Sequence, residues 1–277
     1  MIWQTSRFNI HLDRPQVMGI VNVTPDSFSD GGRHASAVAA LSHCEQLLKD
    51  GADILDIGGE STRPGATPVT LDDELARLLP VVRGAVQLGV PVSVDSYKPA
   101  VMQAVLDLGA DIVNDIWALR QPGAAAVVAG HPGCGVCLMH MHGEPRTMQL
   151  QPMTGDVMSQ VRDFLVAAAA ALEAQGVAAR RIVIDPGIGF GKSVAQNFAL
   201  LARQDALAAA GYPLLAGWSR KSSLAAVAAA PEATDRVAPS VAAALLAVQR
   251  GARIVRVHDV RETVQALQVL AAVNAAS

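Results

Sequence analysis

The stretch VPVSVDSYKPAVMQAVLDLGADIVND, residues 90–115, decides the fold of this 277-residue chain. Two short runs rich in β-branched residues, Val90 to Val94 and Ile112 to Asp115, flank a longer segment whose apolar residues follow helical spacing. A strand, a helix and a second strand in this order are typical of a parallel βαβ unit. The stretch therefore predicts a parallel sheet whose strands are joined by crossover helices.

The same alternation is repeated along the rest of the chain. Six further short apolar runs, most of them with β-branched residues and each followed by a segment with helical spacing, are predicted strands: Val17 to Val23, Ile54 to Ile57, Gly135 to Met139, Ile182 to Asp185, Leu214 to Gly217 and Ile254 to Val257. Eight βα units in roughly 250 residues match a closed (β/α)8 TIM barrel, whereas an open doubly wound sheet usually has fewer strands. Because no linker divides the chain, we expect one α/β barrel domain over residues 1–277.

A small hairpin is expected ahead of the first barrel strand. Residues Phe8 to Leu12 alternate apolar and polar side chains and run into Asp13-Arg14-Pro15, which is a turn sequence. We expect this hairpin to cover the N-terminal end of the barrel.

The charge of the chain bears on the class of partner. A formal net charge of −3, a pI near 6.1 and the lack of lysine or arginine runs leave no basic field for nucleic acid or an anionic membrane surface. The uncharged stretch Gln121 to Gly143 is interrupted by prolines and glycines, so it does not predict a membrane span. This composition favours a small, diffusible substrate.

The N-terminus and the cysteines indicate the compartment. The sequence MIWQTSRFNIHLDRP lacks the basic segment, apolar run and cleavage site of a signal peptide. Three cysteines, Cys44, Cys134 and Cys137, are an odd and sparse set that argues for a reducing compartment. We therefore expect a cytoplasmic protein.

Polar residues gather at or just past the ends of the predicted strands. The set comprises Asn22, Asp56, Asp95, Asn114, Asp115, His140, Asp185, Ser219, Arg256 and His258. In a (β/α)8 barrel the C-terminal ends of the strands meet at one mouth, where substrates bind. Any single member could instead terminate a strand or cap a helix. The number of coincidences favours a shared site.

The glycine-rich loop at residues 185–193, DPGIGFGKS, invites comparison with nucleotide-binding loops. A Walker loop needs glycine where Pro186 stands, and the dinucleotide pattern needs glycine at Lys192, so neither fits. The glycines are better explained as letting the backbone approach a flat ring, with Phe190 as an apolar wall.

One competing constellation is His131, Cys134, Cys137 and His140, whose spacing suggests zinc or a redox pair. Tetrahedral zinc sites usually draw on two separated ligand pairs, and Cys137 lies inside a predicted buried strand. We therefore interpret these cysteines as core residues.

Eight motifs in order along the chain are similar to those of dihydropteroate synthases. They are MGIVNVTPDSFSDGG (18–32), LDIGGESTRPGA (55–66), VSVDSYKP (92–99), IVNDI (112–116), MHMHG (139–143), IDPGIGFGK (184–192), GWSRKS (217–222) and RVHDV (256–260). The resemblance implies a (β/α)8 barrel and a homodimer. It also implies a transferase that uses Mg2+ to condense 6-hydroxymethyl-7,8-dihydropterin pyrophosphate with p-aminobenzoate, giving 7,8-dihydropteroate and pyrophosphate.

The resemblance also implies roles for individual residues. Asn22 corresponds to the Mg2+ contact, and Asp95, Lys221 and Arg63 to catalytic residues. The implied substrate-binding set is Thr62, Pro64, Asp95, Asn114, Asp185, Gly189, Phe190, Gly217, Ser219, Lys221, Arg256, Val257 and His258. Within it, Asp95, Asn114, Asp185 and Lys221 match the pterin site, Arg256 and His258 the pyrophosphate anchors, and Arg63, Pro64, Ser219 and Lys221 the p-aminobenzoate side. Relatives usually carry glycine where this chain has Pro239, at the start of a helix near the dimer surface.

Three local expectations follow for the mouth of the barrel. Buried aspartates without ligand should be hydrated or paired with Lys221. The segment Ser219-Arg220-Lys221 should open the helix after the seventh strand and favour an anion there. Ser219 is not expected to be a hydrolase nucleophile, because neither an elbow sequence nor a paired histidine is evident.

Two alternatives to the synthase remain open. One is a pterin-dependent methyltransferase of related barrel fold, although those proteins lack the loops at residues 24–28 and 61–64 in this form. The other is a pterin-binding paralogue without catalytic activity, which would usually have lost a loop or phosphate residue.

Overall fold

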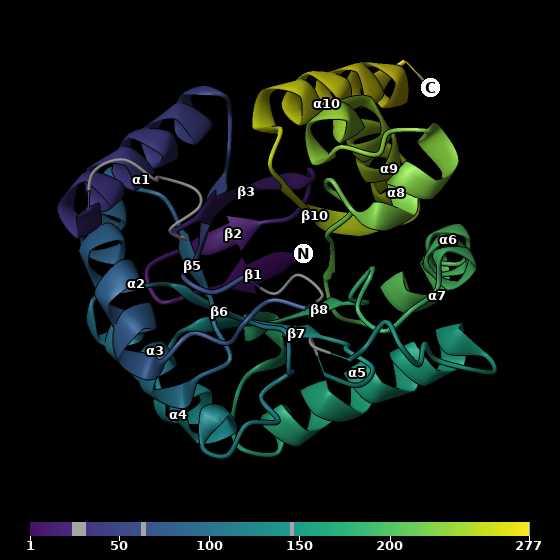
Figure 1. The fold of residues 1–277 in the computed structure, drawn as a ribbon. Helices are drawn as coiled ribbons and strands as arrows, with labels where there is room; N and C mark the ends of the chain where they lie inside the picture. Colours follow the sequence, from purple (N-terminus) through teal and green to yellow (C-terminus); the bar gives the residue numbers. More distant parts are fainter. Residues whose placement is uncertain (24–31, 62–64, 145–146, 277) are drawn as a thin grey trace.

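The computed structural model describes residues 1–23, 32–61, 65–144 and 147–276, and in it eight parallel strands close into a barrel (Figure 1). Around the barrel the strand order is β10-β3-β4-β5-β6-β7-β8-β9. The strands are β3 (Gln16–Asn22), β4 (Ile54–Gly58), β5 (Val92–Asp95), β6 (Ile112–Asp115), β7 (Gly135–Met139), β8 (Ile182–Asp185), β9 (Leu214–Ala216) and β10 (Ala252–Val257). The predicted (β/α)8 TIM barrel is thereby confirmed.

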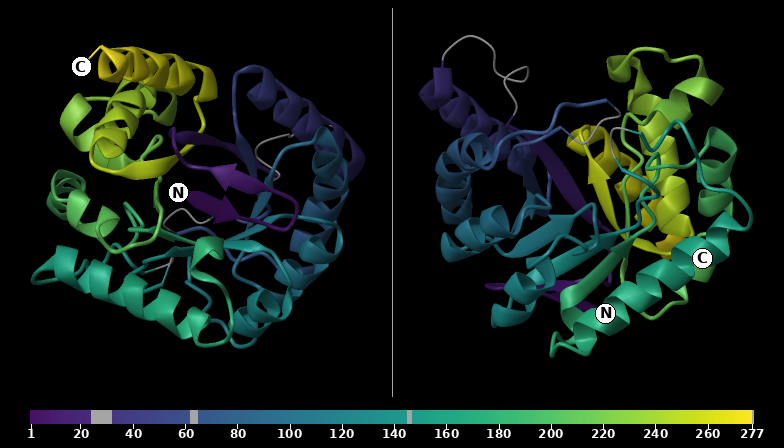
Figure 2. Two further views of the ribbon diagram at one scale, coloured as in Figure 1. Left: turned by 180° about the vertical axis from the view of Figure 1, so that it is seen from behind. Right: turned by 60° about the horizontal axis from the view of Figure 1, so that its bottom comes forward.

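Helices follow every barrel strand and lie around its outside (Figures 1 and 2). They are α1 (Gly32–Lys49), α2 (Leu71–Ala85), α3 (Pro99–Asp107), α4 (Ala124–Gly130), α5 (Val157–Glu173), α6 (Val194–Ala202), α7 (Asp205–Ala208), α8 (Ser222–Ala228), α9 (Val237–Gln249) and α10 (Val260–Ala275), with short 3-10 turns at Val86–Leu88, Ala179–Arg181 and Ala233–Arg236. Within the described ranges, no helix combines the length and the apolar character needed to cross a membrane.

Alternation along the strands separates the outer core from the barrel interior. On β5, Val92 and Val94 pack into the apolar layer between the barrel and its helices. Ser93 lies between them and donates a hydrogen bond to Asp56 of the neighbouring β4. Because successive side chains of a strand point to opposite faces, Asp95 follows Ser93 toward the interior. Because of this alternation, polar side chains such as those of Asp56, Ser93 and Asp95 face the barrel interior together.

Strand boundaries agree with prediction within about two residues, and one of the two largest shifts has a chemical reason. The strand predicted from Val90 begins at Val92, because Pro91 has no N–H to donate to the ladder. The carbonyl of Pro91 still accepts from the Leu55 N–H at 3.1 Å. Pro91 therefore contributes an acceptor to the sheet, but no donor, one residue before β5 begins.

The N-terminal hairpin covers the N-terminal end of the barrel, as predicted. It pairs β1 (Ile2–Gln4) with β2 (Asn9–His11) in antiparallel register. Trp3 is fully buried against residues that begin the barrel strands, and its indole N–H donates to the Arg181 carbonyl at 3.0 Å. The predicted turn position was wrong: the hairpin turns at residues 5–8, where the Thr5 N–H donates to the Phe8 carbonyl at 2.8 Å, and residues 13–15 lead into β3.

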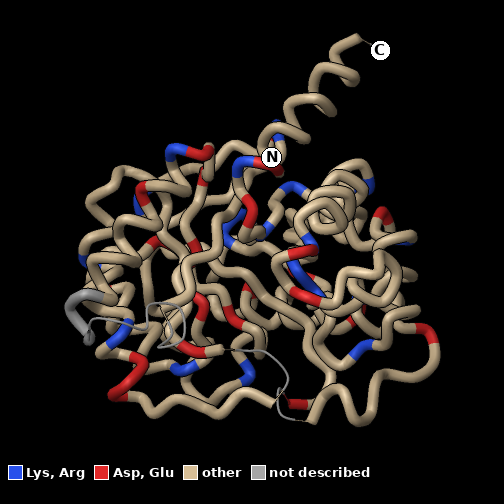
Figure 3. The backbone as a smooth tube through the Cα atoms, turned by 45° about the horizontal axis from the view of Figure 1, so that its top comes forward, with Lys and Arg blue, Asp and Glu red and all other residues tan. Residues whose placement is uncertain are grey.

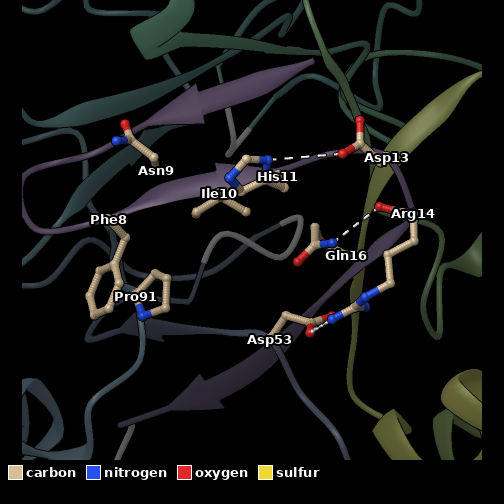
Figure 4. A pocket seen from close by; sticks show the side chains of 9 residues that line it. All are labelled: Phe8, Asn9, Ile10, His11, Asp13, Arg14, Gln16, Asp53 and Pro91. Carbon is tan, nitrogen blue, oxygen red and sulfur yellow. Dashed lines mark hydrogen bonds and ion pairs between the residues drawn. The ribbon is translucent and has the colours of Figure 1, made fainter.

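A hollow of about 610 Å³ lies beside the hairpin, as Figure 4 shows. Its lining includes Phe8 and Pro91 on one side and the ion pair between Arg14 and Asp53 on the other. Gln16 and Asp53 stand where β3 begins and just before β4, so this hollow is at the opposite end of the barrel from the C-terminal strand ends. It does not coincide with the predicted mouth.

Candidate active site

A buried carboxylate organises the mouth of the barrel. Asp56 on β4 has no exposed surface and accepts hydrogen bonds from three side chains on other strands. The donors are the Ser93 hydroxyl at 2.6 Å, the Arg256 Nε at 2.6 Å and the Asn114 amide at 3.2 Å. Sequence reasoning placed Asp56 at a strand end but gave it no role. Its position between Leu55 and Ile57 inside an apolar strand was the available signal for an inward-facing charge.

Asp95 and Asp56 are bridged by one guanidinium. The Arg256 Nη2 donates to Asp95 at 2.9 Å while its Nε contacts Asp56. The expectation that a buried aspartate would pair with Lys221 is therefore wrong for Asp95, whose partner is Arg256. Burial alone would lower the pKa of Arg256, but the two carboxylates raise it, so the guanidinium stays charged.

Asp95 is the carboxyl group in this cluster whose proton affinity is most relevant to chemistry near neutral pH. Burial raises the pKa of Asp95 to about 7, with Arg256 opposing that rise and Asp56 adding to it. The Asp95 side chain is 12% exposed, whereas that of Asp56 is wholly buried. Asp95 can therefore both meet a bound molecule and change its protonation state near neutral pH.

Asp185 lies at the end of β8, where the glycine-rich loop begins. Its Oδ1 accepts from the Gly187 N–H at 2.7 Å. Burial raises the pKa of Asp185, while that N–H and the charges of Lys221 and Lys192 act against the rise. Gly217, which follows β9, faces this carboxylate: a Cβ there would lie 3.9 Å from Asp185 Oδ2.

Phe190 and Lys221 together form one wall of the barrel mouth. The ammonium of Lys221 lies 4.3 Å from the centre of the Phe190 ring, within the range of a cation–π contact. A Cβ added to Gly189 would be 3.4 Å from the Lys221 side chain. The loop after β8 and the segment before α8 are thus in contact.

Lys192 is a functional candidate that the sequence reasoning missed. It is 2% exposed, and its ammonium donates to the carbonyls of Gly187 at 2.9 Å, Phe190 at 3.1 Å and His140 at 3.3 Å. Burial lowers the pKa of Lys192 to about 7, and Asp185 opposes that shift. A lysine directly after a GxGxG run was the visible signal, but the interpretation of that run rested on its glycines and Phe190 and gave Lys192 no role.

Ser219 and His258 connect the ends of β9 and β10. The Ser219 hydroxyl lies 2.9 Å from His258 Nδ1 and accepts the His258 backbone N–H at 3.1 Å. The expectation that Ser219 lacks a histidine partner was therefore wrong. Ser219 also does not open a helix: α8 begins at Ser222, with Lys221 as its N-cap residue.

Asp115 and His140, two of the predicted strand-end residues, make structural contacts. Asp115 accepts the N–H groups of Trp117 at 2.8 Å and Leu119 at 2.7 Å, and burial raises its pKa to about 6. His140 packs edge-on against Phe164, and burial lowers its pKa to about 3. Asp115 therefore serves the backbone, whereas the buried Nδ1 of His140 has no hydrogen-bond partner among the described residues.

Other predicted site residues take no part in the contacts given above or lie outside the described residues. Val257 packs in the outer core beneath the helices. Asn22 ends β3 in register with Gly58 of β4. Thr62, Arg63, Pro64 and the first-loop stretch 24–31 lie outside the described residues.

A second charged cluster, also missed from the sequence, lies beside Asp95. The Lys98 ammonium contacts both Glu60 and Glu74 at 2.5 Å, and Tyr97 donates to Glu60 at 2.9 Å. The cluster joins Glu60, which follows β4, and Glu74 of α2 to the residues just before α3.

The residue types bear on whether a metal can bind. Among the described parts of the chain, no three His, Cys, Asp or Glu side chains are arranged to hold a metal ion. Cys137 packs in the barrel core with Trp3, which confirms its predicted burial. A single hard oxygen donor such as the Asn22 amide suits Mg2+, which keeps waters and substrate phosphates as most of its ligands.

Comparison with known proteins agrees with this geometry. Residues 18–258 match the family model described as "Pterin binding enzyme". A dihydropteroate synthase of Neisseria meningitidis serogroup B is 50% identical over 97% of this chain and 96% of its own length. The Burkholderia cenocepacia dihydropteroate synthase structure complexed with 7,8-dihydropteroate is 54% identical, covers 99% of this chain and 97% of that chain, and has a TM-score of 0.91. The Xanthomonas albilineans enzyme with 4-aminobenzoic acid is 50% identical, with 99% of both chains covered and a TM-score of 0.93.

The barrel of eight strands is closed, and carboxylates line its mouth. The chain is also about 50% identical to these enzymes over nearly its whole length. The chain belongs to the dihydropteroate synthase family of pterin-binding enzymes.

Proposed function

We propose that this chain condenses 6-hydroxymethyl-7,8-dihydropterin pyrophosphate with p-aminobenzoate to form 7,8-dihydropteroate and pyrophosphate. The observation that carries this proposal is the enclosed pair of carboxylates, Asp95 and Asp185, set at one mouth beside the Phe190–Lys221 wall. The relatives solved with 7,8-dihydropteroate and with 4-aminobenzoic acid support the same substrates.

The pterin half of the substrate matches the buried acceptors. A pterin edge presents an amino group and ring N–H donors, and carboxylates accept two such donors at once. Asp185, Asp95 and Asn114 supply these acceptors from β8, β5 and β6. Phe190, the apolar group proposed to meet the ring, is held in a buried cluster with Met139, Met141, Ile116 and Met148.

The pyrophosphate half is assigned to Arg256 and His258. Both stand on or just after β10, and loops after the last two barrel strands commonly hold phosphate. The charge that develops on the departing oxygens is stabilised by fixed cationic groups, an effect typically worth several kcal/mol. Asn22 would hold Mg2+, which would supply further positive charge at the departing group.

The p-aminobenzoate half is assigned to Lys221 and Ser219. Lys221 is placed over Phe190, so a cation and an aromatic face are available together for a benzoate. Family resemblance adds Thr62, Arg63 and Pro64 of the second loop to this side, and Gly189 gives the ring room to approach.

The reaction breaks the bond from the methylene carbon to the pyrophosphate oxygen and forms a bond from that carbon to the amine nitrogen, which then loses a proton. The electron-rich pterin ring delocalises the positive character of the carbon, and ionised Asp95 favours it electrostatically. A neutral arylamine is nucleophilic at pH 7, so no strong general base is needed.

Replacement of the Asp95 carboxylate tests this mechanism. Asp95→Asn keeps the size of the side chain but removes its negative charge, so kcat is expected to fall about 100-fold at saturating substrates. Steady-state release of pyrophosphate measures the change, with Asp163→Asn on the exposed face of α5 as a control. Undiminished turnover of Asp95→Asn would rule out the electrostatic role.

The function itself is tested by pyrophosphate release from the pterin pyrophosphate, with and without p-aminobenzoate and Mg2+. Release that requires Mg2+ and yields 7,8-dihydropteroate is expected, and residual release without the amine would support a dissociative route. Pterin binding without any release would leave a non-catalytic pterin-binding protein as the explanation.

The role of Asn22 has its own measurement. Asn22→Ala should weaken pyrophosphate binding measured in the presence of Mg2+ by about tenfold, and should leave binding measured in EDTA unchanged. Equal affinities for the variant and the wild type in Mg2+ would exclude Asn22 as a ligand.

We also propose that the protein is a cytoplasmic homodimer. Exposed apolar side chains on three neighbouring helices support the dimer: Val227 of α8, Leu246 of α9, and Val269 and Val273 of α10. Pro239 stands in the first turn of α9, a position where proline is tolerated, so it does not disturb this surface.

A further inference from the structure

Two backbone segments at the mouth approach each other too closely for any side chain to lie between them. A Cβ added to Gly187 would be 2.0 Å from the His140 carbonyl oxygen, and one added to Gly191 would be 2.2 Å from that of His142. Both glycines have positive φ, at 65° and 70°. The loop after β8 therefore lies directly against the loop after β7.

Lys192 joins these two segments through its side chain. Its three N–H donors meet three carbonyl acceptors: Gly187 and Phe190 in the loop after β8, and His140 at the end of β7. The ammonium is thus fully satisfied without water, at an exposure of 2%. No carboxylate competes for it at hydrogen-bond distance in the described parts of the chain.

The contacts of this loop lead to the substrate side of the mouth. Gly187 donates its N–H to Asp185 at 2.7 Å, and Phe190 carries Lys221 over its ring. A shift of the loop would move the Gly187 N–H, which binds Asp185, and the Phe190 ring together. The groups assigned to pyrophosphate are held differently: Arg256 is fixed by Asp56 and Asp95, and His258 by Ser219.

We propose that Lys192 is a positioning residue that sets Phe190 and Asp185 for the pterin ring and does not itself touch substrate. This inference rests on the proposed function, because it assigns Asp185 and Phe190 to the pterin. Its consequence is a selective one. Loss of the ammonium should weaken recognition of the pterin ring and spare recognition of pyrophosphate.

The test compares Lys192→Met, which keeps the length of the side chain but has no donors, with Lys192→Arg, which keeps charge and donors. Lys49→Met at the exposed end of α1 is the matched control. Binding of 6-hydroxymethyl-7,8-dihydropterin and, separately, of pyrophosphate with Mg2+ is measured by calorimetry well below each variant's Tm. We expect at least tenfold weaker pterin binding for Lys192→Met, pyrophosphate binding within twofold of wild type, and partial recovery of pterin binding in Lys192→Arg.

Three results would overturn the proposal. They are unchanged pterin affinity in Lys192→Met, equal losses for pterin and pyrophosphate, and failure of both Lys192 variants to fold, since the last two indicate a purely structural role. Turnover by the wild type is assayed alongside. A wild type that binds pterin without turnover contradicts the proposed function alone, and one with turnover beside a Lys192→Met of normal pterin affinity contradicts this inference alone.

Discussion

At the scale of single residues, Asp95 makes the stability of the protein depend on pH. Burial raises its pKa from 3.8 to about 7 in the folded state, so the folded protein binds this proton more tightly than the unfolded chain. The stability that this group contributes is complete below about pH 4 and is lost as pH rises through 7.

The expected result is a pH-dependent difference between wild type and Asp95→Asn. The free energy of unfolding of wild type should fall relative to that of the variant between pH 4 and 7, by at most about 1.4 kcal/mol per pH unit. Urea titrations of both proteins at several pH values measure this difference. Subtracting the two curves removes the groups that they share, and a difference independent of pH would contradict the raised pKa.

At the scale of elements, the loop after β8 depends on Gly187. Gly187→Ala adds a Cβ where the His140 carbonyl oxygen stands 2.0 Å away, in a backbone conformation with φ of 65°. We expect it to lower the free energy of unfolding by several kcal/mol, because both strain and displacement of the β7 end contribute.

Gly176→Ala is the matched control for that substitution. Gly176 also has positive φ, at 91°, but a Cβ there would meet no atom within 4 Å. Its cost should be about 1 kcal/mol, the conformational part alone. Guanidinium unfolding of both variants gives the two values, and equal losses would mean that the close approach to His140 carries no energy.

The elements themselves were largely predictable from sequence, whereas their contacts were not. Periodicity of apolar residues located the eight strands, since alternation and β-branching are properties of neighbouring residues. The Arg256–Asp56 pair joins positions 200 residues apart, and no local pattern states which strand closes against which. The helix start at Ser222 was missed because the positive φ of Arg220, at 58°, breaks the segment before it.

At the scale of the whole molecule, exposed apolar helices lie on one part of the surface. Figure 3 shows α10 extending from the body with no Lys, Arg, Asp or Glu in its last turns. Val269 of that helix is 66% exposed, and Leu246 of the adjoining α9 is 41% exposed. Exposed apolar side chains on adjoining helices are typical of protein–protein interfaces.

Introducing charge there tests the proposed dimer. Val269→Glu should shift the protein from dimer to monomer at micromolar concentration in size-exclusion chromatography with light scattering, because an interface excludes an unpaired carboxylate. Val166→Glu on α5, at an exposed apolar position away from these helices, should leave the mass unchanged. A monomeric wild type would remove the proposal.

Closure of the barrel between β3 and β10 also constrains when this protein can become active during its synthesis. A ribosome releases Asp56 long before it releases Arg256, so for most of translation the central carboxylate lacks its cationic partner. Burying it in that interval would leave an uncompensated charge, which disfavours early collapse of the N-terminal half around it. Nascent chains that stop before residue 252 should therefore remain open and dependent on chaperones, and pterin chemistry should begin only once the final strand has emerged.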